Sequence, residues 1–278
     1  MSGKSPRLVA PPGACDTHMH FYDENVPSAA GGPPLPGHFT VPMYQELQKR
    51  LGLERVIVVQ PNAYQADNRV TVEALRVLGP SAKGVGVVTP DATNGHIVQL
   101  TMAGICAQRI FQLPHGAVGF DKMDQVMAKV HPFGWHANIQ LDGRDMLKYE
   151  AQIKKLPGRF VIDHVGKFLV PVPPQHESFR SLLQLLDTGR CWVKLSAPYE
   201  VSKTGGPKYE DVTKLAKALV KHAPERMLWA SNWPHPSAPA DHKPDDADLL
   251  DLLLDWAPDD ATRRKILVDN PAELYGFK

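Results

Sequence analysis

The sequence has few of the features that mark secreted or membrane proteins. Among its 278 residues there are only three cysteines, and no two of them form a CxxC pair, which argues against a disulfide framework and a structural zinc site. No apolar run reaches the roughly 18 residues that a membrane span needs. The first residues, "MSGKSPRLVAPPGA", hold no apolar core of a secretory signal. These absences predict a cytoplasmic protein without a membrane partner, whose cysteines are buried free thiols.

An excess of charge of one sign is also absent. The chain has 31 basic and 30 acidic residues and a net charge of +1, and no basic block or acidic tail stands out. This balance argues against a nucleic-acid partner and against a disordered charged arm. A small molecule is therefore the expected partner, and the sequence leaves open whether the chain forms a homo-oligomer.

A regular alternation of apolar and amphipathic segments runs through the chain. Short runs rich in Val and Ile, several of them apolar on both faces as in buried parallel strands, predict strands over 14–21, 55–61, 84–90, 107–113, 136–141, 159–166, 191–197 and 226–232. Amphipathic stretches predict helices over 42–52, 67–79, 119–131, 145–156, 177–189, 209–225, 245–258 and 259–276.

Eight such alternations predict an α/β fold, a single-domain (β/α)8 TIM barrel over residues 1–278. A doubly wound open sheet is the alternative, but that fold usually carries a GxGxxG turn after its first strand, and this chain has none there. The first strand is followed instead by a Pro- and Gly-rich stretch over 22–39. A loop of this length predicts a lid or wall of an active site.

Polar side chains gather where these strands end, and in a TIM barrel the active site lies at the C-terminal ends of the strands. His18 and His20 stand two residues apart on the first strand and therefore share a face. His164 ends the sixth strand. The three imidazoles could together bind one metal ion or one substrate, or they could simply be strand residues with ordinary hydrogen bonds.

Two cations lie near the predicted histidine cluster. Arg109 stands inside the apolar run "AQRIFQL", and a buried Arg needs a partner. That partner is either a substrate carboxylate or an internal acid such as Asp163. Lys167 follows "IDHVG" and either binds an anion or is solvated.

Strand eight ends in "SNWPHP", with Asn232 at the position where an acid would act as a base or a metal ligand. An amide has no useful basicity near pH 7. The residue therefore argues against a site that activates water.

Three motifs, "DTHMH", "IDHVGK" and "WASNWPHP", occur in that order on strands one, six and eight. Together they resemble the amidohydrolase superfamily over Pro11 to Tyr275, and more narrowly its branch that contains pyrone dicarboxylate lactonase. The resemblance implies catalytic roles for His18, His20, His164 and Asn232. It implies substrate binding by Arg109, Asn62, Gln65, Gln140, Lys167, Tyr199 and His235.

Many members of the superfamily hold divalent metal ions, but this chain departs from their ligand set. No lysine ends strand four, His136 opens strand five rather than closing it, and Asn232 replaces an Asp. The lactonase branch is known for working without metal. The resemblance therefore implies no metal and no cofactor.

Within this branch, the resemblance extends to a relative with the same change on strand eight and so implies a lactone isomerase of the galactarolactone type. Such an enzyme interconverts six- and five-membered lactones of an aldaric sugar acid by intramolecular acyl transfer. The attacking hydroxyl is tethered, which supplies up to ~7–11 kcal/mol as effective molarity, and Asn232 is expected to donate a hydrogen bond to it. The carboxylate of the lactone is expected to bind Arg109.

Three alternatives stay open. One is a lactonase that hydrolyses a carboxylated lactone of the pyrone dicarboxylate or muconolactone type, using a histidine or a repositioned acid such as Asp67 or Glu200. Another is an introduced Asp-to-Asn change at position 232. The third, from another functional class, is a catalytically silent protein that binds sugar acids.

Overall fold

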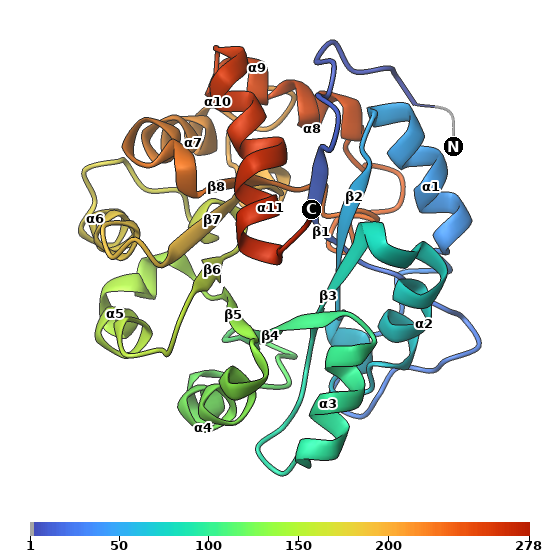
Figure 1. Ribbon diagram of the computed structural model, residues 1–278. Coiled ribbons are helices and arrows are strands. Elements are labelled where there is room, and N and C mark those ends of the chain that lie inside the picture. Colours follow the sequence, from blue (N-terminus) through green and yellow to red (C-terminus); the bar gives the residue numbers. More distant parts are fainter. Residues whose placement is uncertain (1–2) are drawn as a thin grey trace.

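A computed structural model describes residues 3–278, and within them eight parallel strands follow one another around a barrel (Figure 1). Each strand pairs with the next in sequence order, so the predicted TIM barrel is confirmed. The strands are β1 (Cys15–Met19), β2 (Arg55–Val59), β3 (Ala82–Gly86), β4 (Ile105–Phe111), β5 (His136–Gln140), β6 (Phe160–Ile162), β7 (Cys191–Leu195) and β8 (Met227–Trp229).

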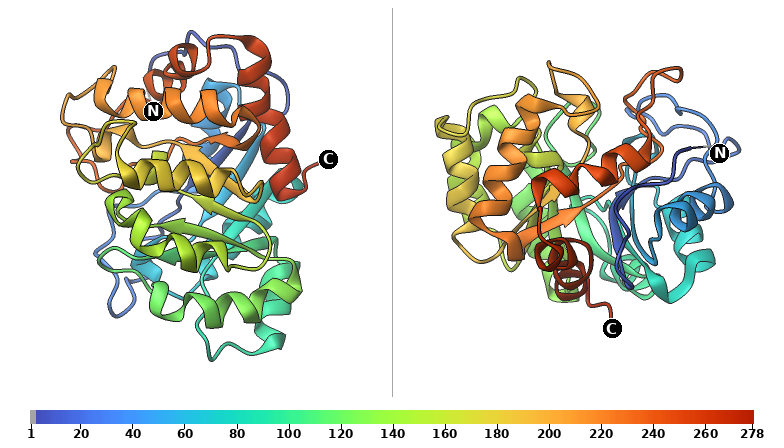
Figure 2. Two further views of the ribbon diagram at one scale, coloured as in Figure 1. Left: turned by 90° about the vertical axis from the view of Figure 1, so that its left-hand side faces the viewer. Right: turned by 90° about the horizontal axis from the view of Figure 1, so that it is seen from above.

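Helices cover the outside of the strands in both turned views (Figure 2). They are α1 (Val41–Leu51), α2 (Arg69–Leu78), α3 (Asn94–Met102), α4 (Phe120–Val130), α5 (Met146–Lys154), α6 (Glu177–Leu186), α7 (Glu210–His222), α8 (Asp246–Asp251), α9 (Leu253–Trp256), α10 (Asp260–Arg264) and α11 (Asn270–Tyr275). A π-helical turn, η8 (Lys265–Asp269), joins α10 to α11. Within the described residues, no helix is both long enough and apolar enough to span a membrane.

The ends of α1 and α2 follow from local sequence. Gly52 and Gly79 stand directly after them with φ of 72° and 71°, a backbone region that glycine enters without steric cost. The helix α3 was not predicted from the sequence. It begins at Thr93, whose hydroxyl caps the His96 N–H at 3.2 Å, but only Ile97 and Leu100 of its residues are buried, so its apolar pattern is weak.

The barrel closes between β1 and the segment that follows β8. The N–H of Asn232 donates to the carbonyl of His18, and the N–H of His20 donates to the carbonyl of Trp233, each at 2.8 Å. Asp16 adds a side-chain link, accepting from the backbone N–H and the hydroxyl of Ser231 at 3.0 and 2.5 Å. These bonds fix the ends of the first and last strands side by side.

Apolar side chains fill one end of the barrel interior. Inward side chains of seven strands, among them Trp192, pack against Leu274 and Tyr275 of α11. This helix lies across one end of the barrel beside the C-terminus (Figure 1). A separate apolar layer fills the space between strands and helices. Cys15 and Cys191 are buried free thiols as predicted, whereas Cys106 is only half-buried. The other end of the barrel stays open for a polar site.

Candidate active site

The site is built from short turns at the C-terminal ends of the strands. Three of these turns are η1 (Asn62–Tyr64) after β2, η5 (His164–Gly166) after β6 and η6 (Pro198–Glu200) after β7. His164, Asn232 and His235 have φ of 55°, 59° and 60°, a left-handed region that costs a residue other than glycine about 1–3 kcal/mol. The strands therefore end earlier than the sequence predicts, because the chain turns sharply to aim these side chains.

A cavity of about 440 Å³ opens at this end of the barrel. Seven of the predicted site residues line it: His20, Asn62, Arg109, Gln140, His164, Lys167 and Asn232. Pro33 and Pro36 of the 22–39 loop line it as well. The loop is docked on η1, since the Ala29 N–H donates to the Ala63 carbonyl at 2.8 Å and a Cβ on Gly32 would lie 2.4 Å from that same oxygen. The loop therefore forms a fixed wall of the cavity.

The two histidines of β1 belong to one directed chain of hydrogen bonds. The Nζ of Lys194 lies 3.1 Å from His18 Nδ1, His18 Nε2 lies 3.2 Å from His20 Nε2, and His20 Nδ1 lies 2.7 Å from the Val59 carbonyl. An ammonium can only donate and a carbonyl can only accept. The chain therefore runs one way: His18 carries its proton on Nε2 and His20 carries its proton on Nδ1. His18 is completely buried behind His20.

Lys194 is the centre of this arrangement, although the sequence reasoning did not assign it to the site. Its ammonium lies 2.7 Å from Asn138 Oδ1, 3.1 Å from His18 Nδ1 and 3.1 Å from Asp163 Oδ1. The contacts with Asn138 and His18 are hydrogen bonds, and the contact with Asp163 is an ion pair. Asn138 Nδ2 in turn donates to Asp163 Oδ2 at 2.8 Å. All four side chains have no exposed surface.

The histidines of the site are neutral. Burial lowers the pKa of His20 to about 3, with a further contribution from the charge of Arg109. Burial also lowers the pKa of His18 and His164 well below the usual range. Neutral imidazoles can polarise a carbonyl or pass on a proton without adding positive charge. His164 Nδ1 is held by the Ser196 hydroxyl at 2.8 Å, which leaves Nε2 as the nitrogen available to a ligand.

Arg109 is the buried cation that faces the cavity. Its guanidinium donates to the Gln60 carbonyl at 2.6 Å and to Asn62 Oδ1 at 3.1 Å, and its Nε has no partner within residues 3–278. In this part of the chain Arg109 forms no ion pair, so Asp163 is not its partner. A buried guanidinium with neutral partners and an unused donor is suited to a carboxylate ligand.

Lys167 is the second cation on the wall, and it is paired with Glu200. Both side chains are less than one-tenth exposed. Glu200 also accepts from the Ser237 hydroxyl. Glu200 is the one acid among the residues that line the cavity, and this ion pair leaves it poorly placed to act as a free base.

Asn232 projects from the end of strand eight with its amide group held in one direction. Its Nδ2 donates to the Tyr199 hydroxyl at 2.8 Å and to Glu200 Oε1 at 3.3 Å. A carboxylate only accepts, so the amide nitrogen faces Glu200. The oxygen Oδ1 is then the atom that can meet a ligand, and the expected donor role of Asn232 becomes an acceptor role.

Three buried side chains have ligand atoms close enough to hold a metal ion: His18, Asp163 and His164, within 4.8 Å of one another. The ammonium of Lys194, however, lies 3.1 Å from both His18 and Asp163. A divalent cation there would stand beside this buried positive charge, and His18 Nε2 is already used toward His20. The residues present therefore do not fit a resident divalent metal.

Four predicted site residues lie behind the cavity wall. His18 supports His20, and Tyr199 and His235 lie behind Asn232. Gln65 donates to the carbonyls of Asn62 and His115, at 2.7 and 2.8 Å, and so ties two loops together. Sequence reasoning assigned no role to Lys194, Asn138 or Asp246. The signal for Lys194 was present, because a Lys inside the apolar run "CWVKLSA" needs buried partners.

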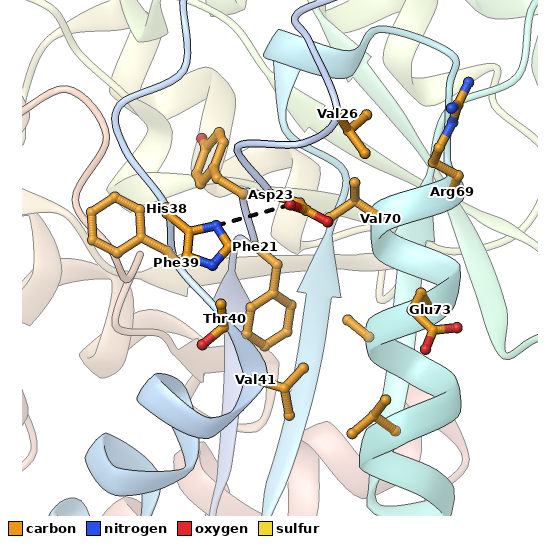
Figure 3. A pocket seen from close by; sticks show the side chains of 13 residues that line it. Phe21, Asp23, Val26, His38, Phe39, Thr40, Val41, Arg69, Val70 and Glu73 are labelled. Carbon is orange, nitrogen blue, oxygen red and sulfur yellow. Dashed lines mark ion pairs between the residues drawn. The ribbon is translucent and has the colours of Figure 1, made fainter.

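A separate hollow of about 490 Å³ lies between the 22–41 segment and α2 (Figure 3). Its walls are mostly apolar and include Phe21, Val26 and Val41. The pair of Asp23 and His38, 4.0 Å apart, lies at its edge (Figure 3). It lacks the buried charged and imidazole groups of the barrel mouth.

Comparison with known proteins places these features in a family. The model of the amidohydrolase family matches residues 15–277. D-galactarolactone isomerase of Agrobacterium fabrum is 38% identical over 99% of this chain and 95% of its own length. 4-Sulfomuconolactone hydrolase of Hydrogenophaga intermedia is 32% identical over 97% of this chain and 91% of its own length. A ligand-free crystal structure of an Agrobacterium tumefaciens protein is 37% identical, covers 100% of this chain and 98% of that one, and superposes with a TM-score of 0.95.

Proposed function

The chain belongs to the amidohydrolase family, and from the site in its barrel we propose that it is a lactone isomerase. The proposed reaction interconverts six- and five-membered lactones of an aldaric sugar acid, of the galactarolactone type, by internal acyl transfer. The similarity to D-galactarolactone isomerase over nearly the whole length of both chains supports this proposal.

The observation that carries the proposal is the state of the acids at the cavity. Asn232 stands where a strand-eight acid would act as base, and Glu200 is paired with Lys167. The neutral histidines are weak bases, since the pKa of His20 is lowered by burial to about 3. Such a site has no strong base to activate water, whereas a hydroxyl tethered to the lactone gains up to ~7–11 kcal/mol from effective molarity.

In the proposed complex, the free carboxylate of the lactone binds the guanidinium of Arg109, which lines the cavity and contacts only the neutral groups of Gln60 and Asn62. Gln140, with an unpartnered Oε1 within the described chain, and Asn62 face the sugar hydroxyls. Arg109 and Lys167 line the same cavity, but the charge of Lys167 is balanced by Glu200. The cavity therefore offers one uncompensated cation, which matches a lactone with one carboxylate.

The proposed step forms one C–O bond and breaks another. The tethered hydroxyl donates to Asn232 Oδ1, which aims its lone pair at the lactone carbonyl, while His164 donates from Nε2 to the carbonyl oxygen and stabilises the oxyanion. The intermediate collapses by expelling the ring oxygen. The proton of the attacking hydroxyl passes to the departing ring oxygen, which is bonded to the same tetrahedral carbon, so no net proton is taken up.

We further propose that the reaction uses no metal ion. The argument rests on the donor set: the ammonium of Lys194 lies beside two of the three candidate ligands, and the strand-eight position offers a neutral amide. Carbonyl polarisation then falls to His164 rather than to a Lewis acid.

Hydrolysis of a carboxylated lactone is the competing proposal. The similarity to 4-sulfomuconolactone hydrolase favours it. A hydrolase would need Glu200 to leave Lys167 and act as the base for water. In the structure Glu200 accepts from Lys167, Asn232 and Ser237 together, which disfavours that change.

A product-resolved assay tests the proposal. Six-membered galactarolactone incubated with the protein and followed by NMR should give the five-membered lactone before free galactarate. Galactarate appearing first would support the hydrolase, and no change with any aldarolactone would refute both proposals. Activity after EDTA treatment should equal activity before it.

Replacement of Asn232 tests the role of the missing base. In Asn232→Asp, a carboxylate stands beside Glu200, and mutual repulsion raises its pKa toward neutrality, so the ratio of hydrolysis to isomerisation should rise on the order of tenfold or more. Asn62→Asp is the matched control, because it adds the same charge to the same cavity next to Arg109. The control should weaken substrate binding but leave the product ratio unchanged.

A further inference from the structure

A row of polar side chains from three segments lies behind Asn232. Asn232 Nδ2 donates to the Tyr199 hydroxyl at 2.8 Å, and that oxygen lies 3.0 Å from His235 Nδ1. His235 Nε2 lies 3.1 Å from Asp246 Oδ1 at the start of α8. His235 and Asp246 are 3% and 6% exposed, and neither they nor Tyr199 line the cavity of the barrel mouth. The row therefore acts on a substrate only through Asn232.

The acid at the far end sets the direction of every proton in this row. The N–H of His235 does not point straight at Asp246, but neither of the two facing atoms has another hydrogen-bond partner within residues 3–278. An N–H on Nε2 is attracted by the carboxylate 3.1 Å away, whereas an unprotonated Nε2 would hold its negative lone pair beside that charge, so the proton belongs on Nε2. His235 Nδ1 is then an acceptor, and the Tyr199 hydroxyl donates to it.

Tyr199 is thereby left with lone pairs for Asn232. Its single proton is used on His235, so its oxygen can only accept from the Asn232 amide nitrogen. A flip of the Asn232 amide would place Oδ1 against the lone pairs of Tyr199 and the carboxylate of Glu200. The flip is therefore opposed on both sides.

We infer that Asp246, His235 and Tyr199 form a positioning chain that keeps the oxygen of the Asn232 amide facing the substrate. This inference rests on the proposed isomerase for its catalytic consequence, because an accepting oxygen is what orients the attacking hydroxyl. As in a catalytic triad, an acid fixes the tautomer of a histidine. Here the histidine does not activate a nucleophile but, through Tyr199, holds the orientation of the Asn232 amide. His235 is then a positioning residue, although the sequence suggested that it binds substrate.

The first test removes the hydroxyl in the middle of the chain. Tyr199→Phe keeps the ring but takes away the acceptor for Asn232, and kcat for isomerisation should fall on the order of tenfold, with KM within about twofold. Tyr275→Phe is the matched control, because the buried Tyr275 hydroxyl at the other end of the barrel has no partner among the described residues. The control should leave kcat unchanged.

The second test reads the proton positions directly and needs no substrate. Nitrogen-15 NMR of the unmutated protein should show His235 protonated on Nε2, and Asp246→Asn should shift it toward a mixture of tautomers. Solvent exchange of the Asn232 amide protons should become faster in Tyr199→Phe and in Asp246→Asn, but not in Tyr275→Phe. A thermal melt of each variant checks that it is folded.

The outcomes separate this inference from the proposed function. A His235 proton on Nδ1 in the unmutated protein overturns it, as does a Tyr199→Phe variant that matches Tyr275→Phe in both kcat and amide exchange. Tautomer and exchange changes as expected, in a protein that does not isomerise the lactone, would uphold the chain and refute the isomerase. A kcat loss without any change in exchange would refute the chain alone.

Discussion

Lys194→Met is the substitution for which the structure predicts the largest effect. The methionine has a similar length, but it supplies no donor to His18, Asn138 and Asp163, which surround the ammonium at 2.7–3.1 Å. Asp163 then stays in the barrel as a buried charge without its cation. Removing one partner of a buried ion pair costs about 3–5 kcal/mol, and we expect that loss in the free energy of unfolding.

The charge state of Asp163 determines the pH at which the loss of stability should be measured. Burial raises the pKa of Asp163, but the charges of Lys194 and Arg109 outweigh burial and hold it below the usual range. A carboxylate with a lowered folded pKa contributes stability above its unfolded pKa of about 3.9 and loses it as the pH falls below that value. Urea unfolding at pH 7 therefore measures the full contribution.

A second substitution shows whether the loss comes from the uncompensated acid. Asp163→Asn in the Lys194→Met background removes the charge, and the new amide can donate to His18 Nδ1, which lies 3.4 Å from Asp163 Oδ1. The double variant should therefore recover at least ~1.5 kcal/mol relative to the sum of the two single losses. Lys154→Met, in an exposed pair with Glu150, is the control and should change stability by less than ~1 kcal/mol.

The reasoning would be refuted by a Lys194→Met protein within ~1 kcal/mol of the unmutated one, or by single losses that add within ~0.5 kcal/mol in the double variant. The first result would mean that the ammonium does not compensate the buried acid. The second would mean that Lys194 and Asp163 act independently.

Three further predictions concern the cavity and its charges. Lys194→Met should bind about one zinc ion per chain through His18, Asp163 and His164, whereas the unmutated protein should bind none by mass spectrometry after dialysis. Arg109→Met should raise KM for the lactone acid about 10- to 100-fold, from the loss of a charge-assisted hydrogen bond, but should not raise KM for its methyl ester. Burial lowers the pKa of Lys167 to about 8, so the ammonium is lost as pH rises through that value. The Glu200 carboxylate is then left uncompensated at the cavity and repels the carboxylate of the lactone. KM should therefore rise above pH 8 in the unmutated protein and stay flat in Lys167→Met, measured by initial rates.

The barrel could be predicted because its signal is repeated along the whole chain. Each strand contributes a short apolar run and most of the helices an amphipathic stripe, so the missed helix α3 did not disturb the count of strands. The ends of the strands could not be predicted, as β8 shows: the apolar pattern runs over 226–232, but the strand is Met227–Trp229. The following segment still bonds to β1 through the Asn232 N–H, but the left-handed φ of 59° at Asn232 interrupts the extended backbone of a strand.

The members of the site could be predicted more readily than their contacts. Polar residues at strand ends meet in any barrel of this type, which brought His20, His164, Arg109 and Asn232 to one cavity. Lys194 was missed although it has the same signal as Arg109, a cation in an apolar strand. Its partners come from β1, β5 and the end of β6, and β1 shifts register between Asp16 and Met19, so no spacing in the sequence shows that these side chains converge.

For Asn232 the sequence determines the chemistry of the side chain, but the direction of its amide depends on neighbouring side chains. Its identity alone removes the base, and that conclusion needs only the chemistry of an amide. The direction of the amide, however, depends on Tyr199 and Glu200, which reach it from η6. An amide has a donating end and an accepting end of nearly equal size, so only neighbours with fixed hydrogen-bonding roles can choose between them. Glu200 can only accept, which turns the nitrogen toward Glu200 and leaves the amide oxygen as the acceptor for a hydroxyl of the proposed substrate.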